Sequence, residues 1–223
     1  MKNVFITGGN GDIGSSIVNI FSSNGYNVVY PSSKELNLKN HNDIDMYFKK
    51  YGINYDIVVH CAGVNNINNI EDLDIDNIYD TFQINTVSFF QIIKNVLPYQ
   101  KINGGHILGI SSLYGNISRA GRLPYAMSKH ALIALIQTAA IELAQYNILI
   151  NALSPGFVYT EMTKKNNSEE RIKYIESSIP LSKLADVTDI AKTAYFLCSS
   201  DNTYITGQDI IVDGGFMCGG FQR

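Results

Sequence analysis

The sequence predicts an α/β fold in which a doubly wound parallel sheet carries helices on both of its faces. First, short apolar runs typical of buried strands alternate with segments of helical period along the whole chain. Second, the 223 residues are enough for one domain with a full hydrophobic core. Third, no repeat, low-complexity tract or linker divides the chain. We therefore expect residues 1–223 to form a single domain.

Composition and charge exclude several classes of protein. The net charge is −3 and no basic block is present, so neither nucleic acid nor an anionic membrane surface is expected as a partner. No apolar run reaches the roughly 18 residues of a membrane span, and no signal peptide is expected before the first strand. Three scattered cysteines predict neither a disulfide framework nor a zinc site. We expect a cytoplasmic protein without a metal.

Six strands and five helices account for most of the chain. The strands are expected at residues 4–6, 27–30, 56–60, 105–110, 147–153 and 209–212. The helices are expected at residues 15–24, 44–51, 75–97, 125–145 and 186–198. Pro98 interrupts the third helix, and Pro124 suits the start of the fourth.

The first strand leads directly into a turn with glycines at positions 8, 11 and 14, and helical spacing follows. Glycines allow a tight turn and close approach of a ligand, while a helix N-terminus offers free N–H groups to a phosphate. A simple strand-to-helix turn is the alternative. Strand, glycine turn and helix together favour a dinucleotide site, and hence a Rossmann-type fold.

The segment after the second strand bears on the choice of cofactor. In sites of this type, an acidic residue at the end of that strand holds the ribose hydroxyls of NAD. Residues 31–35 read Pro-Ser-Ser-Lys-Glu, so the acidic residue comes late. Ser32, Ser33 and Lys34 suit the 2′-phosphate of NADP, which is therefore favoured over NAD, although a solvated polar loop is the alternative. Few residues lie between Tyr30 and Leu36, so the usual crossover helix is expected to be nearly absent from this segment.

Tyr125 and Lys129 are four residues apart in the fourth helix, and therefore share one of its faces. A nearby ammonium favours the phenolate, so Lys129 is predicted to lower the pKa of Tyr125 from about 10. A phenol with a lowered pKa can act as an acid and a base. Ser112, at the end of the strand at 105–110, supplies a candidate partner hydroxyl. Alone, a Tyr-x-x-x-Lys pair arises by chance in many helices.

Three further polar features each allow two interpretations. Asn85 has apolar neighbours, where it either braces the core or holds a water in a proton path. His60 ends a buried strand and is interpreted as a structural histidine, with a catalytic role as the alternative. Residues 159–182, the most polar stretch, are either a solvated loop and helix or a mobile lid over the site, and we expect a lid.

Together these motifs resemble the short-chain dehydrogenase/reductase family, in its smaller single-domain branch. The resemblance covers essentially the whole chain and keeps the order of the motifs. Residues 7–14 resemble the family's cofactor turn, and residues 61–63 its Asn-Asn-Ala-Gly segment. The family's catalytic tetrad is matched by Asn85, Ser112, Tyr125 and Lys129. Its nicotinamide segment and C-terminal signature are matched by Asn151, Pro155, Gly156 and Thr160, and by residues 206–208 and 212–215.

The resemblance implies an NAD(P)-dependent oxidoreductase that interconverts a carbonyl and a secondary alcohol by hydride transfer. Tyr125 is expected to donate a proton to the carbonyl oxygen, or to take it back in oxidation, while Ser112 hydrogen-bonds that oxygen. Lys129 is expected to lower the Tyr125 pKa and to bind the nicotinamide ribose. Asn85 is expected to hold a proton-relay water. The cofactor carries the hydride chemistry, so no metal is required.

The motifs and the resemblance together define the expected cofactor-binding residues. They are Gly8, Asn10, Gly11, Asp12, Ile13, Gly14, Ser32, Ser33, Lys34, Asn37, Cys61, Ala62, Gly63, Tyr125, Lys129, Pro155, Gly156, Val158 and Thr160. Two residues depart from the family pattern. Asp12 stands where the second glycine belongs, and we expect its carboxylate to point outward or to cap the helix. His60 replaces an asparagine near the adenosine side.

The substrate is expected to be a small molecule. Segments 117–122 and 154–163 resemble those of bacterial family members linked to surface-polysaccharide or nucleotide-sugar pathways, which implies a sugar or nucleotide-sugar derivative. The runner-up is a 3-oxoacyl carrier-protein reductase. A non-catalytic cofactor-binding sensor or assembly protein is a second class, and an epimerase or dehydratase with tightly held NAD a third. Arg119 and Arg122 either reach an anionic substrate or sit at a subunit contact. The resemblance implies a homo-oligomer, tetramer or dimer, formed through helices 75–97 and 125–145.

Overall fold

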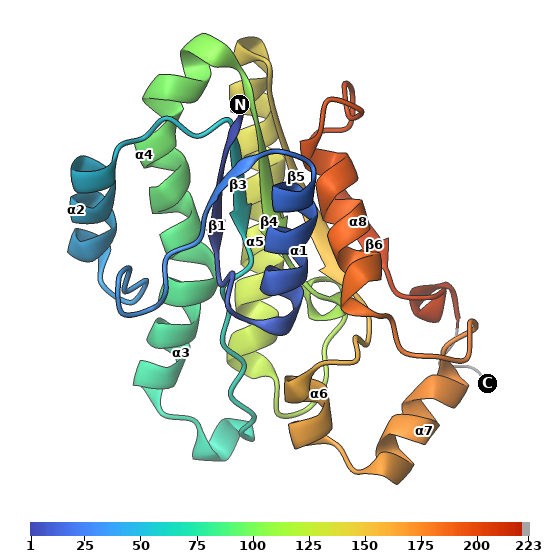
Figure 1. The fold of residues 1–223 in the computed structure, drawn as a ribbon. Helices are drawn as coiled ribbons and strands as arrows, with labels where there is room; N and C mark the ends of the chain where they lie inside the picture. Colours follow the sequence, from blue (N-terminus) through green and yellow to red (C-terminus); the bar gives the residue numbers. More distant parts are fainter. Residues whose placement is uncertain (220–223) are drawn as a thin grey trace.

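The computed structural model describes residues 1–219, apart from the side chains of Met162 and Asn166. Its centre is a six-stranded parallel sheet in the order β2-β1-β3-β4-β5-β6 (Figure 1). The strands are β1 (Asn3–Thr7), β2 (Asn27–Val29), β3 (Ile57–His60), β4 (Gly105–Ile110), β5 (Ile148–Pro155) and β6 (Asp209–Val212). The helices are α1 (Asp12–Ser23), α2 (His41–Tyr51), α3 (Ile75–Phe82), α4 (Ser88–Asn103), α5 (Leu123–Leu143), α6 (Glu161–Asn166), α7 (Glu169–Ser178) and α8 (Val187–Cys198).

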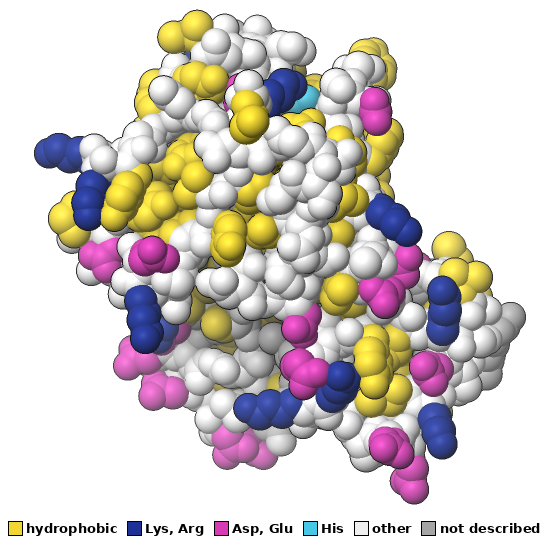
Figure 2. Space-filling view, viewed as in Figure 1, with side chains coloured by type: hydrophobic (Ala, Val, Ile, Leu, Met, Phe, Trp, Pro, Cys, Tyr) yellow, Lys and Arg dark blue, Asp and Glu magenta, His cyan; other side chains and the backbone are white. Residues whose placement is uncertain are grey.

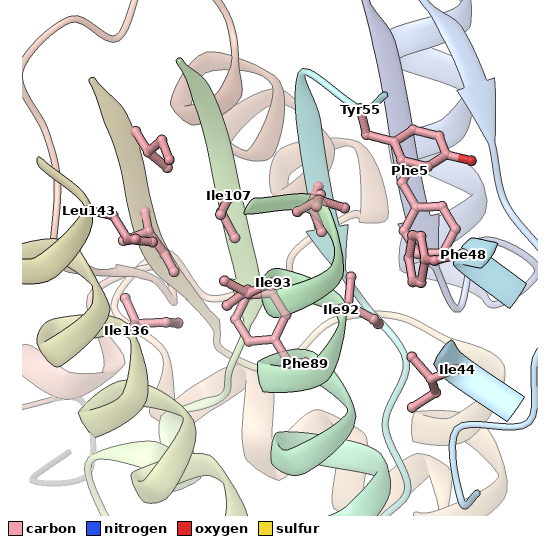
Figure 3. Packing of buried hydrophobic residues seen from close by; sticks show 14 of the residues in the cluster. Phe5, Ile44, Phe48, Tyr55, Phe89, Ile92, Ile93, Ile107, Ile136 and Leu143 are labelled. Carbon is pink, nitrogen blue, oxygen red and sulfur yellow. The ribbon is translucent and has the colours of Figure 1, made fainter. Parts of the chain in front are cut away.

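Alternate residues of the strands point to opposite faces of the sheet, so each face has its own core. In β1, Phe5 packs into one core, while Val4 and Ile6 pack into the other. The first core is covered by α2, α4 and α5, and Figure 3 shows their side chains, among them Phe48, Phe89 and Ile136, around the strands. The second core is covered by α1 and α8. Helices therefore lie on both faces, as predicted.

The chain reverses direction across the sheet next to β1. It runs from β1 through α1 to β2 at one edge, then returns through α2 to β3 on the other side of β1. Residues 30–40 contain only turns, as expected, but the crossover itself is complete because α2 makes it. Within residues 1–219, only β2 lies beyond β1, whereas the common dinucleotide-binding order 3-2-1-4-5-6 has two strands there.

The helix predicted at residues 75–97 consists of α3, a π-helix at Gln83–Val87, and α4. Pro98 does not end α4, which continues to Asn103. Proline removes one intrahelical donor, which leaves the carbonyl group of Lys94 without its usual partner. Both Lys94 and Pro98 are exposed, so that carbonyl lies on the solvent side of the helix. The prediction that Pro98 interrupts the helix is therefore wrong.

The polar stretch after β5 forms α6 and α7, which lie at the carboxyl end of the sheet (Figure 1). Ile175 and Ile179 pack with Leu184 in a small separate cluster, so α7 is tied to the body of the protein by few apolar contacts. Figure 2 shows acidic and basic side chains interspersed over this face rather than gathered by sign. Among residues 1–219, no helix has the length and apolarity needed to cross a membrane.

Candidate active site

A cavity of about 650 Å³ opens at the carboxyl ends of the strands, next to the point where the chain reverses across the sheet. Open α/β sheets bind ligands at this place. The cavity extends from the segment after β2, past the glycine turn, to the first turns of α5. All the predicted catalytic and cofactor-binding residues line it except Lys34 and Asn85. The structure therefore brings together residues from nearly the whole length of the chain.

The glycine turn between β1 and α1 is closely packed. A Cβ atom on Gly8 would lie 2.6 Å from the Ala62 nitrogen, and one on Gly14 would lie 2.0 Å from the Gly8 carbonyl oxygen. Gly8 also has a positive φ of 70°, which side chains disfavour. Gly11 occupies the N-cap of α1, and no side chain caps that end. The first amide groups of α1 thus remain free for an anion, as a bound diphosphate requires.

Asp12 is an exposed residue in the first turn of α1, and its side chain does not cap that helix. Its Oδ2 atom accepts a hydrogen bond of 2.7 Å from the backbone N–H of Glu161, at the start of α6. The expectation that Asp12 caps the helix after the glycine turn is therefore wrong, because no side chain caps α1. The carboxylate joins the glycine turn to the polar stretch 149 residues later.

The end of the cavity next to β2 differs from expectation. Lys34 is exposed and does not line the cavity, whereas Lys39 does, with its ammonium 2.5 Å from Asp80. The Ser32 amide and hydroxyl both donate to a carboxylate oxygen of Glu35, at 2.8 and 2.7 Å. These hydrogen bonds lower the pKa of Glu35. Lys34 is therefore not part of the cavity wall, and its expected contact with a 2′-phosphate stays a prediction.

Tyr125 and Lys129 lie one turn apart on α5 and face the cavity together. The Lys129 ammonium lies 5.6 Å from the centre of the Tyr125 ring and donates to the carbonyl oxygen of Ile110 at 2.7 Å. Ser112 follows β4, and its side chain lies close enough to the Tyr125 phenol to lower the pKa of that phenol. A phenol, a hydroxyl and an ammonium thus converge on one wall of the cavity.

Burial controls the pKa values of this cluster. It raises the pKa of Tyr125 above 10, although the side chain of Ser112 and the cation of Arg122 lower it. Burial also lowers the pKa of Lys129 to about 8. The prediction that Lys129 lowers the Tyr125 pKa is therefore wrong for this state of the protein, because desolvation of the phenolate outweighs the attraction of Arg122, and Lys129 is not among the groups that lower this pKa.

Asn85 lies in the π-helix and is fully buried behind the cavity wall. Its amide oxygen accepts from the Val64 N–H at 2.9 Å, and its amide nitrogen donates to the Val64 carbonyl and the Ser128 hydroxyl. These contacts connect the segment after β3 with α5, one residue before Lys129. Of the two interpretations of Asn85, these side-chain contacts support the one in which it braces the core.

His60 is likewise fully buried, with its ring stacked on Phe89 at 5.0 Å. Nδ1 lies 2.9 Å from the Thr7 hydroxyl, and Nε2 lies 3.1 Å from the Ile84 carbonyl. A neutral ring that donates from Nε2 and accepts at Nδ1 satisfies both contacts. Burial lowers the pKa of His60 to about 3, so it is uncharged at neutral pH and has the structural role that was favoured.

Comparison with known proteins identifies the family. Residues 34–217 match a family model described as Enoyl-(Acyl carrier protein) reductase. The 3-oxoacyl-[acyl-carrier-protein] reductase FabG of Buchnera aphidicola is 31% identical over an alignment of 238 positions, which covers 96% of each chain. The chain belongs to the short-chain dehydrogenase/reductase family. The predicted fold class and the prediction of an NAD(P)-dependent oxidoreductase are confirmed by this membership.

Other relatives and solved structures agree with this assignment. The trans-4-hydroxycyclohexanecarboxylate dehydrogenase of Sinomonas cyclohexanicum is 33% identical over 75% of this chain and 62% of its own. A 4-hydroxyisoleucine dehydrogenase complexed with NADH superposes with a TM-score of 0.92 at 26% identity, covering 98% of this chain and 100% of its own. The structure of ElxO with NADP bound superposes with a TM-score of 0.87 at 28% identity, covering 97% of this chain and 99% of its own.

Sequence reasoning missed some residues of the site. Tyr114 was not singled out, yet its ring centre lies 6.3 Å from that of Tyr125. The available signal was its place two residues after Ser112, in the loop at the carboxyl edge of the sheet. Arg122 was named only for its charge, and its effect on the Tyr125 pKa depends on the structure. Lys39 was not considered, because it lies after residues 31–35, the segment from which the choice of cofactor was predicted.

Proposed function

We propose that the protein reduces a small-molecule carbonyl to a secondary alcohol, and catalyses the reverse oxidation, with Ser112, Tyr125 and Lys129 as the reacting wall. The observation that carries this proposal is the single cavity, which has a glycine turn at one end and these three side chains at the other. The cavity is large enough for an extended cofactor, and the close packing of Gly8 and Gly14 keeps its floor free of side chains.

Each residue has a separate role in this proposal. The Tyr125 phenol donates a proton to the carbonyl oxygen, and a phenol whose pKa is raised holds that proton near neutral pH. Ser112 holds the same oxygen by a hydrogen bond. Lys129 provides a positive charge beside the developing phenolate, while Asn85 positions α5. When bound, the nicotinamide cofactor supplies or accepts the hydride.

The residues that would hold the cofactor are those that line the cavity from the segment after β2 to β5. We keep NADP as the favoured cofactor, because Ser32, Ser33 and Lys39 can meet a 2′-phosphate. NAD is the alternative, since a 4-hydroxyisoleucine dehydrogenase that superposes on this chain is complexed with NADH.

We keep two substrate classes. Segments 117–122 and 154–163 favour a sugar or nucleotide-sugar derivative. The relatives named FabG, which match 96% of the chain, favour a 3-oxoacyl thioester on a carrier protein. A panel that contains keto sugars and 3-oxobutanoyl thioesters separates the two classes by relative kcat/KM.

Cellular setting and assembly are also proposals. Three free cysteines suit a reducing compartment, so we propose a cytoplasmic enzyme. Phe90 of α4 and Ile141 of α5 are 53% and 82% exposed, which supports a homo-oligomer, a dimer or tetramer, formed through these helices. We also keep residues 1–223 as one domain, with residues 159–182 as a mobile lid.

The Tyr125→Phe variant tests the proposed chemistry. It removes the hydroxyl group and keeps the ring, so turnover should fall by about 10² or more while cofactor binding persists. Tyr204→Phe is the matched control, because Tyr204 is 95% exposed and remote in sequence from the site. Consumption of reduced cofactor with the carbonyl panel is the measurement. Wild-type rates in Tyr125→Phe would contradict the proposal, and a wild type that binds cofactor without any turnover would favour the sensor class.

A further inference from the structure

A second cavity, of about 660 Å³, lies on the neighbouring face of α5. Tyr125 and Lys129 line the first cavity, while the next residues along the helix, Ala126 and His130, line the second. Its remaining walls come from Met127 and from residues 68–71 and 118–123. The proposed chemistry assigns no role to this space, which is large enough for a substrate-sized group.

The charged side chains on the wall of the second cavity are mainly cationic. Arg119 and Arg122 line it, and Glu71 is the acidic residue that does so. Among the described side chains, no carboxylate forms an ion pair with Arg122. Its Nη1 atom is buried and has no hydrogen-bond partner. The guanidinium group of Arg122 therefore has one buried nitrogen, Nη1, whose hydrogen-bonding capacity is not used.

Arg122 is also close to the reacting phenol. It is the residue before the first turn of α5, which carries Tyr125. Its Cζ atom lies 5.8 Å from the centre of the Tyr114 ring, and that ring lies 6.3 Å from the ring of Tyr125. These two contacts place the Arg122 Cζ atom within about 12 Å of the centre of the Tyr125 ring.

An unpaired, buried guanidinium nitrogen is costly, since a buried donor without a partner loses its hydrogen bonds to water. The planar fork of arginine matches a carboxylate, which it binds through two parallel hydrogen bonds. The ring of Tyr114 shields one side of the group, and shielding from water strengthens such a contact. A neutral substrate end would leave the nitrogen unpaired.

We propose that Arg122 binds a carboxylate group of the substrate in the second cavity, and so selects oxo acids and hydroxy acids over neutral analogues. The inference rests on the proposed function, because it assigns the far end of the molecule whose carbonyl meets Tyr125. A sugar derivative that carries a carboxylate satisfies both statements, whereas a 3-oxoacyl thioester does not.

Matched pairs of substrates test this inference. We would compare 4-oxopentanoate and 4-oxocyclohexanecarboxylate with their methyl esters, in wild type, Arg122→Gln and Arg122→Lys. Arg171→Gln is the control: it removes the same charge from an exposed arginine whose Cζ lies 4.7 Å from the ring of Tyr174. For the acids, Arg122→Gln should raise KM about 10- to 100-fold, Arg122→Lys should raise it less, and Arg171→Gln should leave it unchanged. KM for the esters should change little in any variant.

Wild-type KM values that are equal for acid and ester, or an equal loss for both in Arg122→Gln, would overturn the inference and leave the proposed function standing. Titration of the acids into the cofactor-loaded protein gives a readout that needs no turnover. If wild type turns over nothing, tighter binding of the acids to wild type than to Arg122→Gln supports the carboxylate site and removes only the proposed function. Equal binding then overturns both.

Discussion

Burial is the main influence on the two titratable groups at the centre of the site. It raises the pKa of the Tyr125 phenol and lowers that of the Lys129 ammonium to about 8. At pH 7, Lys129 is still mostly charged, and its ammonium is held by the Ile110 carbonyl. A charged lysine and a protonated tyrosine are the forms that carbonyl reduction needs, so the pair is set for proton donation.

His60 shows how a buried titratable group links stability to pH. Its folded pKa of about 3 lies well below the ordinary value of 6.5. Between these values the unfolded chain binds a proton that the folded protein does not, so protonation favours unfolding. The cost is absent above about pH 6.5 and grows by about 1.4 kcal/mol for each pH unit below it, until pH 3.

We predict that His60→Asn flattens the acid limb of the stability profile. Asparagine cannot titrate, so the free energy of unfolding of the variant should fall less steeply between pH 6.5 and pH 4 than that of wild type. The variant should be less stable at pH 7, because it loses ring contacts with Phe89. Urea unfolding at several pH values measures both effects. Parallel profiles for the two proteins would show that His60 is not the group responsible.

At the residue scale, the sequence was sufficient to predict which residue types meet but not their environments. The spacing of Tyr125 and Lys129 identified the pair, because helical geometry is local. The sign of the Tyr125 pKa shift was wrong, because it depends on desolvation by residues distant in sequence. The place of Lys34 outside the cavity wall was not predictable for a similar reason, since the Ser32–Glu35 contacts that shape its turn are made by side chains.

At the scale of elements, Asp12 joins α1 to α6 and so bridges the two sides of the cavity entrance. Because its carboxylate accepts a hydrogen bond from the Glu161 amide, Asp12 holds the start of α6 beside the glycine turn. Asp12 also places a negative charge where a diphosphate is expected. The same carboxylate thus holds the polar stretch in place and opposes an anionic ligand.

We predict that Asp12→Asn and Asp12→Gly separate these two effects. Both remove the charge, so both should bind NADPH about 3- to 10-fold more tightly, given that a nearby charge contributes about 1 kcal/mol at a partly exposed site. Asparagine keeps an acceptor for the Glu161 amide, whereas glycine does not. Amide hydrogen exchange in residues 160–168 should therefore speed up only in Asp12→Gly. Equal exchange in all three proteins would mean that Asp12 does not hold α6.

Helices and strands were predictable where their signals are local. All six strands lie within two residues of their predicted positions, because short apolar runs between turns mark them. The π-helix and the continuation of α4 past Pro98 were not predictable. Both depend on the three-dimensional environment of the segment. Asn85 in the π-helix binds Val64 and Ser128, whereas α4 tolerates Pro98 because that side of the helix is exposed to solvent.

At the scale of the whole molecule, strand order creates the cavity. Because β1 and β3 are neighbours while β2 lies at the edge, the loops after these strands diverge and leave a space between them. The parallel sheet and its two covered faces followed from alternation of strands and helices. The single strand beyond β1 did not, because pairing partners are not encoded in the period of any one segment.

The most direct test of the central claim is the thermal stability of the purified protein against increasing NADPH and, side by side, NADH. A ligand that binds only the folded state raises the unfolding temperature as its concentration rises. We predict a clear, saturable increase, larger with NADPH than with NADH. No increase with either cofactor up to millimolar concentration would contradict the assignment of the cavity as a nicotinamide dinucleotide site.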